Sequence, residues 1–357
     1  MKLKLAFVVL ISILISVFIS ILASSARADD AGGYKLLKAV TVGGDGGWDY
    51  LAVDADTRHI YISRGNRIDV FDADSLQKLG EIPDTANVHG VAWDKESGHG
   101  FTSNGNRNDP SVTMFDIKTL KVLKKISVTG RPDGIFFEPF TKHIFVESHS
   151  IPNETVINAA DGTVLGTIDL GGEPEQGASD GNGHVYVNLE STSEVVVVDP
   201  TAMKVTARYK LGEGERPSGI GLDAKNRRIF SCCGNAKMVI LDADNGNIIT
   251  TLPTGRGTDA GTFDPDTLEA FSSNGDGTLT VVKETSPTSF EVEQNVQTEM
   301  GARTCALDSK THNIILVTAQ FEAPTTAPST QPQAENGRRR RPRMIPGTFT
   351  ILVVGKT

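Results

Sequence analysis

Short apolar runs separated by turn residues recur along almost the whole chain. Residues 216–255 show the pattern most clearly, with runs at 218–223, 228–232, 237–242 and 247–252. Runs of this length, bounded by Gly, Pro, Asn and Asp, predict β-strands, and they are too short for helical repeats. The pattern therefore predicts an all-β protein built from four-stranded units.

An acidic residue ends the first predicted strand of each unit, and these residues recur every 40 to 44 positions. They are Asp54, Asp94, Glu138, Asp180, Asp223, Asp264 and Asp308. Seven units with a period in the low forties predict a seven-bladed β-propeller with four-stranded blades. Most units also end their third strand in Asp or Asn, which favours a tight turn. Unit six has Val282-Lys283 there, so a longer turn is predicted at 284–289.

The two ends of the repeat region complement each other. Residues 348–354 resemble a third strand with no fourth strand after it, and residues 34–42 resemble a fourth strand with no unit before it. We expect the N-terminal strand to complete the last blade, because a closed ring leaves no open sheet edge.

Several repeat segments match a known motif, among them 131–135 (RPDGI), 184–188 (HVYVN) and 194–199 (EVVVVD). On these segments the chain resembles the YVTN-type β-propeller repeat family, and in particular YncE-like exported proteins. The resemblance covers residues 34–357 apart from one insert. It implies a propeller fold, but no particular activity, because that family consists mostly of binding or scaffold proteins. Lactonase-type propellers look similar at the level of the repeat.

Residues 1–28 have the pattern of a secretory signal. Lys2 and Lys4 precede an apolar stretch, and small residues end the segment at Ala26-Arg27-Ala28. We expect cleavage after residue 28 and a periplasmic or extracellular protein formed by a single propeller domain at 29–357. The alternative is an uncleaved segment that tethers the protein to a membrane, because the apolar stretch is nearly long enough to span one.

Charge and cysteine content narrow the range of functions. Loss of the three positive charges in residues 1–28 takes the net charge from −9 to −12, which argues against general nucleic-acid binding. The only cysteines are Cys232, Cys233 and Cys305, too few for a disulfide framework. Cys232 and Cys233 are interpreted as two buried thiols on opposite faces of a strand, with a vicinal disulfide as the alternative.

Residues 321–346 interrupt the last unit with a segment rich in Pro, Thr, Gln and Ala. The segment is predicted to be a disordered loop. It carries a cluster of basic residues, which are Arg338, Arg339, Arg340, Arg341 and Arg343. We expect these arginines to make contacts, either with an acidic partner or anionic envelope surface or with the acidic ring of the same chain. The alternative is a loop that only increases solubility.

The position five residues before each acidic marker is rich in charged side chains. The set is Asp49, His89, Asp133, Glu175, Ser218, Asp259 and Arg303. The first strands of a propeller line its central channel, so these residues are predicted to surround the channel mouth and bind a small-molecule or protein ligand. Four carboxylates in one ring also suggest a divalent cation such as calcium, with Asp49, Asp133, Glu175 and Asp259 as candidate ligands. The alternative is an ordinary wet, polar junction between loops and strands.

The loops between second and third strands are expected on the same face and add Glu147, His149 and Glu190. The remaining histidines, apart from His89, are predicted on the opposite face as structural turn residues. The sequence thus favours an exported, monomeric, non-catalytic binding propeller. Two alternatives stay open: a metal-assisted hydrolase of lactonase-like type, with His89 or His149 moving a proton, and a structural cell-envelope protein.

Overall fold

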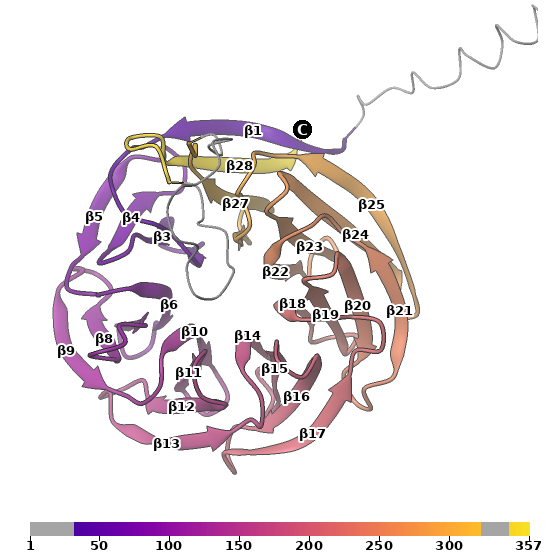
Figure 1. Ribbon diagram of the computed structural model, residues 1–357, viewed down its shortest axis with the longest axis horizontal. Coiled ribbons are helices and arrows are strands. Elements are labelled where there is room, and N and C mark those ends of the chain that lie inside the picture. The colour runs from indigo at the N-terminus through magenta and orange to yellow at the C-terminus, as the bar shows by residue number, and fades with distance from the viewer. Residues whose placement is uncertain (1–31, 323–342) are drawn as a thin grey trace, which may run out of the picture.

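The computed structural model describes residues 32–322 and 343–357, which form seven four-stranded antiparallel sheets arranged in a ring about a central axis (Figure 1). This confirms the predicted seven-bladed β-propeller. In this part of the chain no helix is long and apolar enough to cross a membrane. Residues 1–31 and 323–342, which include the predicted signal and Arg338 to Arg341, lie outside the described residues.

Each blade contributes one strand to each of four concentric positions. The first strands, next to the channel, are β2 (Leu51–Asp54), β6 (Val88–Asp94), β10 (Pro132–Glu138), β14 (Pro174–Ser179), β18 (Pro217–Asp223), β22 (Thr258–Asp264) and β26 (Cys305–Asp308). The second strands are β3 (His59–Ser63), β7 (His99–Asn104), β11 (His143–Ser148), β15 (Val185–Leu189), β19 (Arg228–Cys233), β23 (Glu269–Asn274) and β27 (Asn313–Thr318). The third strands are β4 (Ile68–Asp72), β8 (Ser111–Asp116), β12 (Asn153–Asn158), β16 (Glu194–Asp199), β20 (Lys237–Asp242), β24 (Thr278–Ser286) and β28 (Thr350–Lys356). The outer strands are β5 (Lys78–Ile82), β9 (Val122–Ser127), β13 (Val164–Asp169), β17 (Lys204–Lys210), β21 (Ile248–Pro253), β25 (Ser289–Gln297) and β1 (Tyr34–Thr41).

The N-terminal strand closes the ring. β1 pairs antiparallel with β28, from Tyr34 opposite Lys356 to Thr41 opposite Thr350. The buried phenol of Tyr34 also donates a 2.6 Å hydrogen bond to Glu269 Oε2 in blade six. The predicted completion of the last blade by residues 34–42 is therefore confirmed.

The core is divided into layers between neighbouring blades. Successive side chains of a strand point to opposite faces of its sheet, so one strand serves two layers. On β3, Ile60 and Ile62 pack against blade seven, whereas Tyr61 packs against blade two. Burial of each large apolar side chain contributes about 1.5–3 kcal/mol, so the alternating apolar pattern stabilises both the blades and their arrangement in a ring.

The acidic residues that end the first strands connect adjacent blades on the face opposite the channel mouth. Asp54 Oδ1 accepts a hydrogen bond from the backbone nitrogen of Asp56, which closes the turn, and lies 2.9 Å from Lys95 Nζ of blade two. Around the ring, Asp180 of blade four pairs in the same way with Arg227 of blade five. The acidic residues that recur seven times in the sequence therefore close turns. In several blades they also pair with a basic side chain of the next blade.

The prediction of a longer turn at 284–289 is wrong. β24 continues to Ser286, which lies opposite Ser289, so only Pro287 and Thr288 form the turn. The strands extend because Phe290 packs against the apolar cluster between blades five and six. The hairpin of blade six is thus different from the others, as expected, but through longer strands.

The insert and the cysteines are partly placed by the structure. Phe321 and Met344 form an isolated β-bridge that brings the two ends of the insert together, and the backbone nitrogen of Glu322 donates to the carbonyl of Arg343. Cys232 and Cys233 are free, buried thiols, and they belong to the clusters on opposite sides of blade five. Their side chains therefore point to opposite faces of β19, as predicted from strand geometry.

Candidate functional site

Seven equivalent positions at one face of the ring carry the predicted site residues. His89, Asp133, Glu175, Ser218 and Asp259 are each the second residue of a first strand. Asp49 and Arg303 lie two residues before β2 and β26. Two side chains hold the backbone of Asp49 in place before β2. Ser63 Oγ accepts a hydrogen bond from the backbone nitrogen of Asp49, and Thr304 Oγ1 donates one to the backbone carbonyl oxygen of Asp49 at 2.8 Å.

His89 lies between two carboxylates from neighbouring blades. Its Nδ1 atom is 2.6 Å from Asp49 Oδ2 and 3.1 Å from Asp133 Oδ1. The other ring nitrogen, Nε2, lies 2.9 Å from the side-chain amide nitrogen of Asn87. Although burial lowers the pKa of His89, its contacts with Asp133 and Asp49 outweigh that effect and raise the pKa to about 10. With these contacts the imidazole is positively charged at neutral pH, with a proton on each ring nitrogen.

His149 extends this arrangement to blade four. It comes from the loop between β11 and β12, and its Nδ1 atom lies 3.0 Å from Glu175 Oε1 and 3.7 Å from Asp133 Oδ2. The contact with Glu175 raises the pKa of His149 to about 9, against the effect of burial. Asp133 therefore faces a histidine on each side, one through each carboxylate oxygen.

Arg303 forms the corresponding link on the other side of Asp49. Its guanidinium contacts Asp259 Oδ2 and lies 3.6 Å from Asp49 Oδ1. Acidic and basic groups thus alternate around much of the channel mouth, in the order Asp259, Arg303, Asp49, His89, Asp133, His149 and Glu175. Ser218 does not belong to this row of charged groups. Its hydroxyl donates a hydrogen bond to the carbonyl oxygen of Thr258 in the next blade at 3.0 Å.

Among the seven groups from Asp259 to Glu175, four carboxylates face three cations. This imbalance accompanies raised pKa values for two of the carboxylates. Burial raises the pKa of Glu175 to about 7, although His149 acts in the opposite direction. Burial and the charge of Asp49 raise the pKa of Asp259 to about 6, against the effect of Arg303. For Asp133, burial is outweighed by His89, and the pKa is lowered. Among these seven groups there is one more carboxylate than cation, and the raised pKa values of Glu175 and Asp259 are consistent with this excess together with burial.

Two further acidic groups lie deeper in blade three. Glu147 and Glu154 are fully buried, and none of their four carboxylate oxygens has a hydrogen-bond partner among the described residues. Burial, followed by the charge of Glu154, raises the pKa of Glu147 well above its usual range. The sequence placed Glu147 near the mouth but gave Glu154 no role.

The phenol of Tyr50 lies among the same carboxylates and was also missed in the sequence. Burial, then the charges of Glu175 and Asp133, raise its pKa well above the usual value. Its place immediately after Asp49 is the signal that could have found it, because a residue next to a ring position also lies near the channel.

Three of the four carboxylates predicted as metal ligands, Asp49, Asp133 and Glu175, lie in two groups that each also contain a histidine. Asp49, His89 and Asp133 bring one ligand atom each within 4.8 Å of one another, and so do His149, Glu175 and Glu190. Asp259, predicted as a metal ligand, instead pairs with Arg303. The geometry therefore places imidazole nitrogens alongside carboxylate oxygens as possible ligands at this face.

Other polar hairpin residues on this face are used in folding. Arg64 is fully buried, with its guanidinium carbon 3.5 Å from the centre of the Phe349 ring. Asn104 Nδ2 donates to Thr113 Oγ1 at 2.9 Å within blade two, and Asn274 Nδ2 donates to Thr280 Oγ1 at 3.1 Å in blade six. These side chains stabilise hairpins and are not available to a ligand.

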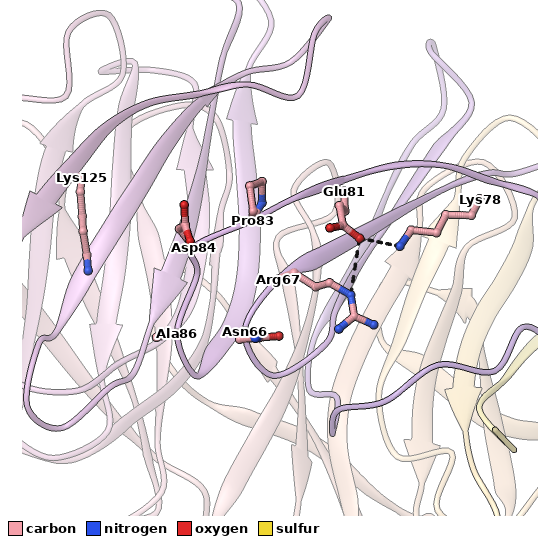
Figure 2. A pocket seen from close by; sticks show the side chains of 8 residues that line it. All are labelled: Asn66, Arg67, Lys78, Glu81, Pro83, Asp84, Ala86 and Lys125. Atoms are coloured by element: carbon pink, nitrogen blue, oxygen red, sulfur yellow. Dashed lines mark hydrogen bonds and ion pairs between the residues drawn. The ribbon is translucent and has the colours of Figure 1, made fainter. Parts of the chain in front are cut away.

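A separate open pocket of about 810 Å³ lies between blades one and two (Figure 2). Figure 2 shows Arg67 and Lys78 converging on Glu81. Both cations also contact Asp69 at 2.8 Å, and Lys125 pairs with Asp109. Because its cations are already paired, this pocket offers a ligand little free charge.

Three histidines of the opposite face have structural contacts. His99 Nδ1 lies 3.1 Å from the carbonyl oxygen of Ala159, and His184 Nδ1 lies 2.9 Å from Asp180 Oδ2. His312 lies 2.8 Å from Asp264, at the turn that follows β22. These contacts agree with the predicted role of turn residues.

The fold is similar to solved seven-bladed propellers of the WD40 type. One is described as "Structure of U3-55K", with a TM-score of 0.73 and 12% identity over 90% of this chain and 99% of that chain. Another is described as "Crystal structure of RRP9 WD40 repeats", with a TM-score of 0.74 and 11% identity over 91% of this chain and 100% of that chain. At this identity the similarity shows the fold alone. No family model and no curated protein matches the chain.

Proposed function

We propose that this protein is an exported, non-catalytic binding propeller whose channel mouth takes a cationic ligand. The observation that carries the proposal is the excess of buried carboxylates over cations among the residues from Asp259 to Glu175. A bound cation would lower the energy of those carboxylates in their charged form. Propellers of the WD40 type often serve as interaction scaffolds, which supports a binding role, whereas the fold alone assigns no ligand.

The convergence of these side chains favours binding over a purely structural envelope role. They come from separate blades, yet they meet at one face, which is the arrangement expected of a site on a rigid ring. Export remains part of the proposal because of the pattern in residues 1–28, and N-terminal sequencing of protein recovered outside the cytoplasm would test it. The arginine-rich insert remains a proposed contact for an acidic partner or anionic envelope surface.

The binding proposal is tested by calorimetric titration with spermidine and with a short oligolysine peptide at low ionic strength. The variant Glu175→Gln/Asp259→Asn removes the two carboxylates with raised pKa values and should weaken binding at least tenfold. The control Glu96→Gln removes an exposed carboxylate on the opposite face and should bind like the wild type. Equal binding by all three proteins, or no binding by the wild type, would contradict the proposal.

One observation supports a hydrolase as a second candidate function. Glu175 has a pKa of about 7, in the range suited to a general base at neutral pH, and it lies 3.0 Å from His149. Turnover of a panel of simple lactones that disappears in Glu175→Gln would favour this candidate. Turnover that is the same in the wild type and in Glu175→Gln would exclude this role for Glu175.

A further inference from the structure

The two histidines of the channel mouth face carboxylate oxygens through the same ring atom, Nδ1. His89 Nδ1 lies within 3.1 Å of two oxygens that belong to Asp49 and Asp133. One N–H bond points in a single direction and cannot donate well to two acceptors. The hydrogen bond of Nδ1 goes to Asp49, so Asp133 Oδ1 lies beside the same nitrogen without a proton to accept from it. Three close ligand atoms from three residues also suit a metal ion.

His149 shows the same feature in blade three. Its Nδ1 atom is buried and lies 3.0 Å from Glu175 Oε1, but it makes no hydrogen bond of acceptable geometry among the described residues. Glu190, from the loop between β15 and β16, places a third ligand atom within 4.8 Å, and its Oε1 atom also accepts a hydrogen bond from Arg216 Nε at 2.9 Å. Arg216 is mostly exposed, so a metal ion can displace it. His149 Nδ1 therefore faces the two carboxylates without donating a proton to either.

Asp133 connects the two groups. Its Oδ1 atom lies 3.1 Å from His89 Nδ1, and its Oδ2 atom lies 3.7 Å from His149 Nδ1. A carboxylate with one oxygen directed to each of two ligand sets is the bridging group of many two-metal sites. Asp133 is almost completely buried, so its two contacts are not loose surface pairs.

An independent feature next to these groups also requires a partner. Glu147 has no exposed surface and no hydrogen bond, and its carboxylate is wedged between the first strands β10 and β14. A Cβ atom at Gly134 would lie 2.8 Å from Glu147 Oε2, and one at Gly177 would lie 2.7 Å from Oε1. The carboxylate thus lies beside Asp133 and Glu175, where it adds a buried acidic group that the described residues leave without a partner.

We propose that the channel mouth binds two divalent transition-metal ions. One is held by Asp49, His89 and Asp133, and the other by His149, Glu175 and Glu190, with Asp133 bridging them. This inference rests on the proposed function and names the cation bound at that site. Metal–ligand bonds of about 2.0–2.2 Å place neighbouring ligand atoms roughly 3.4 Å apart in tetrahedral geometry. The observed separations of 2.6 to 3.7 Å bracket this value, so small side-chain movements suffice.

The ligand chemistry selects the class of metal. Imidazole nitrogen combined with carboxylate oxygen suits zinc, iron or nickel, whereas calcium prefers oxygen ligands alone. The first ion has three protein ligands, which leave at least one coordination position open, as in metal sites that also bind a further molecule. The second ion has four protein ligands, because Asp133 bridges to it. Zinc is the practical probe, because it needs no control of oxidation state.

The test uses tag-free protein that has been treated with chelator, dialysed and titrated with Zn²⁺ alone, with calorimetry and mass-spectrometric metal analysis as readouts. The wild type should bind two ions per chain, and its melting temperature should rise with zinc. His89→Ala and His149→Ala should each bind one ion. Asp133→Asn should weaken binding of both ions at least about tenfold.

His312→Ala is the matched control, because His312 also lies within ligand distance of two carboxylates, Asp264 and Asp266, but on the opposite face. It should still bind two ions. Circular dichroism melts establish that each variant is folded, and the zinc-dependent shift of the wild type needs no variant. The two-ion site would be overturned if the wild type showed no saturable zinc binding. It would also be overturned if the wild type bound a single ion and His89→Ala and His149→Ala each abolished that binding.

The metal site and the binding function fail in different ways. If zinc does not bind but oligolysine still binds and Glu175→Gln/Asp259→Asn weakens it, only the metal site is wrong. If neither probe binds, the proposed function is wrong as well. Zinc loss in His312→Ala with no loss in the mouth variants would place the metal on the opposite face and overturn the inference.

Discussion

Glu147 and Glu154 lie directly opposite each other on β11 and β12, and both carboxyl groups are fully buried. Two charged carboxylates on directly paired residues would repel each other strongly in a medium of low polarity. Blade three therefore holds at least one of these groups in its protonated form near neutral pH.

This pair predicts a loss of stability at alkaline pH. Burial raises the pKa of Glu154 to about 8 in the folded protein, above the value of about 4.3 for an unfolded glutamate. The folded state then binds the extra proton, so this contribution is complete below about pH 4 and is lost as the pH rises through 8. Glu154→Gln should increase the free energy of unfolding at pH 9 by at least about 1.4 kcal/mol, equivalent to one pKa unit.

Urea denaturation of the wild type and Glu154→Gln at pH 5 and pH 9 checks this prediction. Glu299, which is only partly buried, provides the control when it is replaced by Gln, and this change should alter neither free energy of unfolding. A Glu154→Gln variant that is equally destabilised at both pH values would contradict the assigned protonation.

The ion pair that joins the first and last blades should be important for stability. Arg58 Nη1 and Nη2 lie 2.7 and 2.8 Å from the two oxygens of Asp308, whose side chain is only 2% exposed. Arg58→Ala leaves a buried carboxylate without its main partner and should lower the free energy of unfolding by about 3–5 kcal/mol.

Lys142→Ala offers a comparison, because Lys142 and Glu96 also join two blades but are mostly exposed. Lys142→Ala should lower the free energy of unfolding by less than about 1 kcal/mol. Chemical denaturation followed by circular dichroism measures both variants. Similar losses for the two would show that the Arg58 contact contributes no more than a surface ion pair.

Gly105 should be needed for the position of His89. A Cβ atom at residue 105 would lie 2.7 Å from His89 Nε2 and 2.8 Å from the carbonyl oxygen of Pro132. Gly105→Ala should therefore displace the imidazole, weaken zinc binding and destabilise the fold by about 1–3 kcal/mol.

Gly47→Ala is the matched control, because a Cβ atom there meets nothing within 4 Å. Its zinc stoichiometry and melting temperature should equal those of the wild type. Unchanged zinc binding by a folded Gly105→Ala variant would show that the position of His89 does not matter for the metal.

The phenol of Tyr34 should contribute to ring closure. Its hydrogen bond to the buried carboxylate of Glu269 links β1 to blade six. Hydrogen bonds to charged groups contribute about 1.5–3 kcal/mol, so Tyr34→Phe should lose this amount. In Tyr209→Phe the hydroxyl group lost is bonded to the neutral carbonyl of Ala243, and the loss should be about 0.5–1.5 kcal/mol. Denaturation curves that rank the two in the reverse order would contradict this account.

The fold was accessible from the sequence because its signals are local and repeated. The spacing of residues such as Asp54 and Asp308 indicated the number of blades, and the incomplete units at the two ends indicated ring closure. The longer turn in blade six was predicted wrongly, because the packing of Phe290 against the preceding blade is a tertiary effect that strand patterns do not contain.

The candidate site was only partly accessible. The offset from the acidic markers found His89 and Asp133, because strand register fixes where equivalent residues lie. It did not show that Asp133 faces both His89 and His149, because that contact depends on the angle between neighbouring blades. Glu154 could have been found by its symmetry with Glu147 about the hairpin at 148–153, since antiparallel strands pair residues at equal distances from their turn.

The pairing of β1 with β28 also determines when the protein can fold during its synthesis. The strand Tyr34–Thr41 precedes every other strand of the ring in the chain, whereas its partner Thr350–Lys356 follows all of them and is therefore made later. Until then, Ile60, Ile62 and their neighbours in blade one have no apolar surface of blade seven to cover them. Completion of the ring is therefore a late, long-range step, and the growing chain needs protection from aggregation up to that moment.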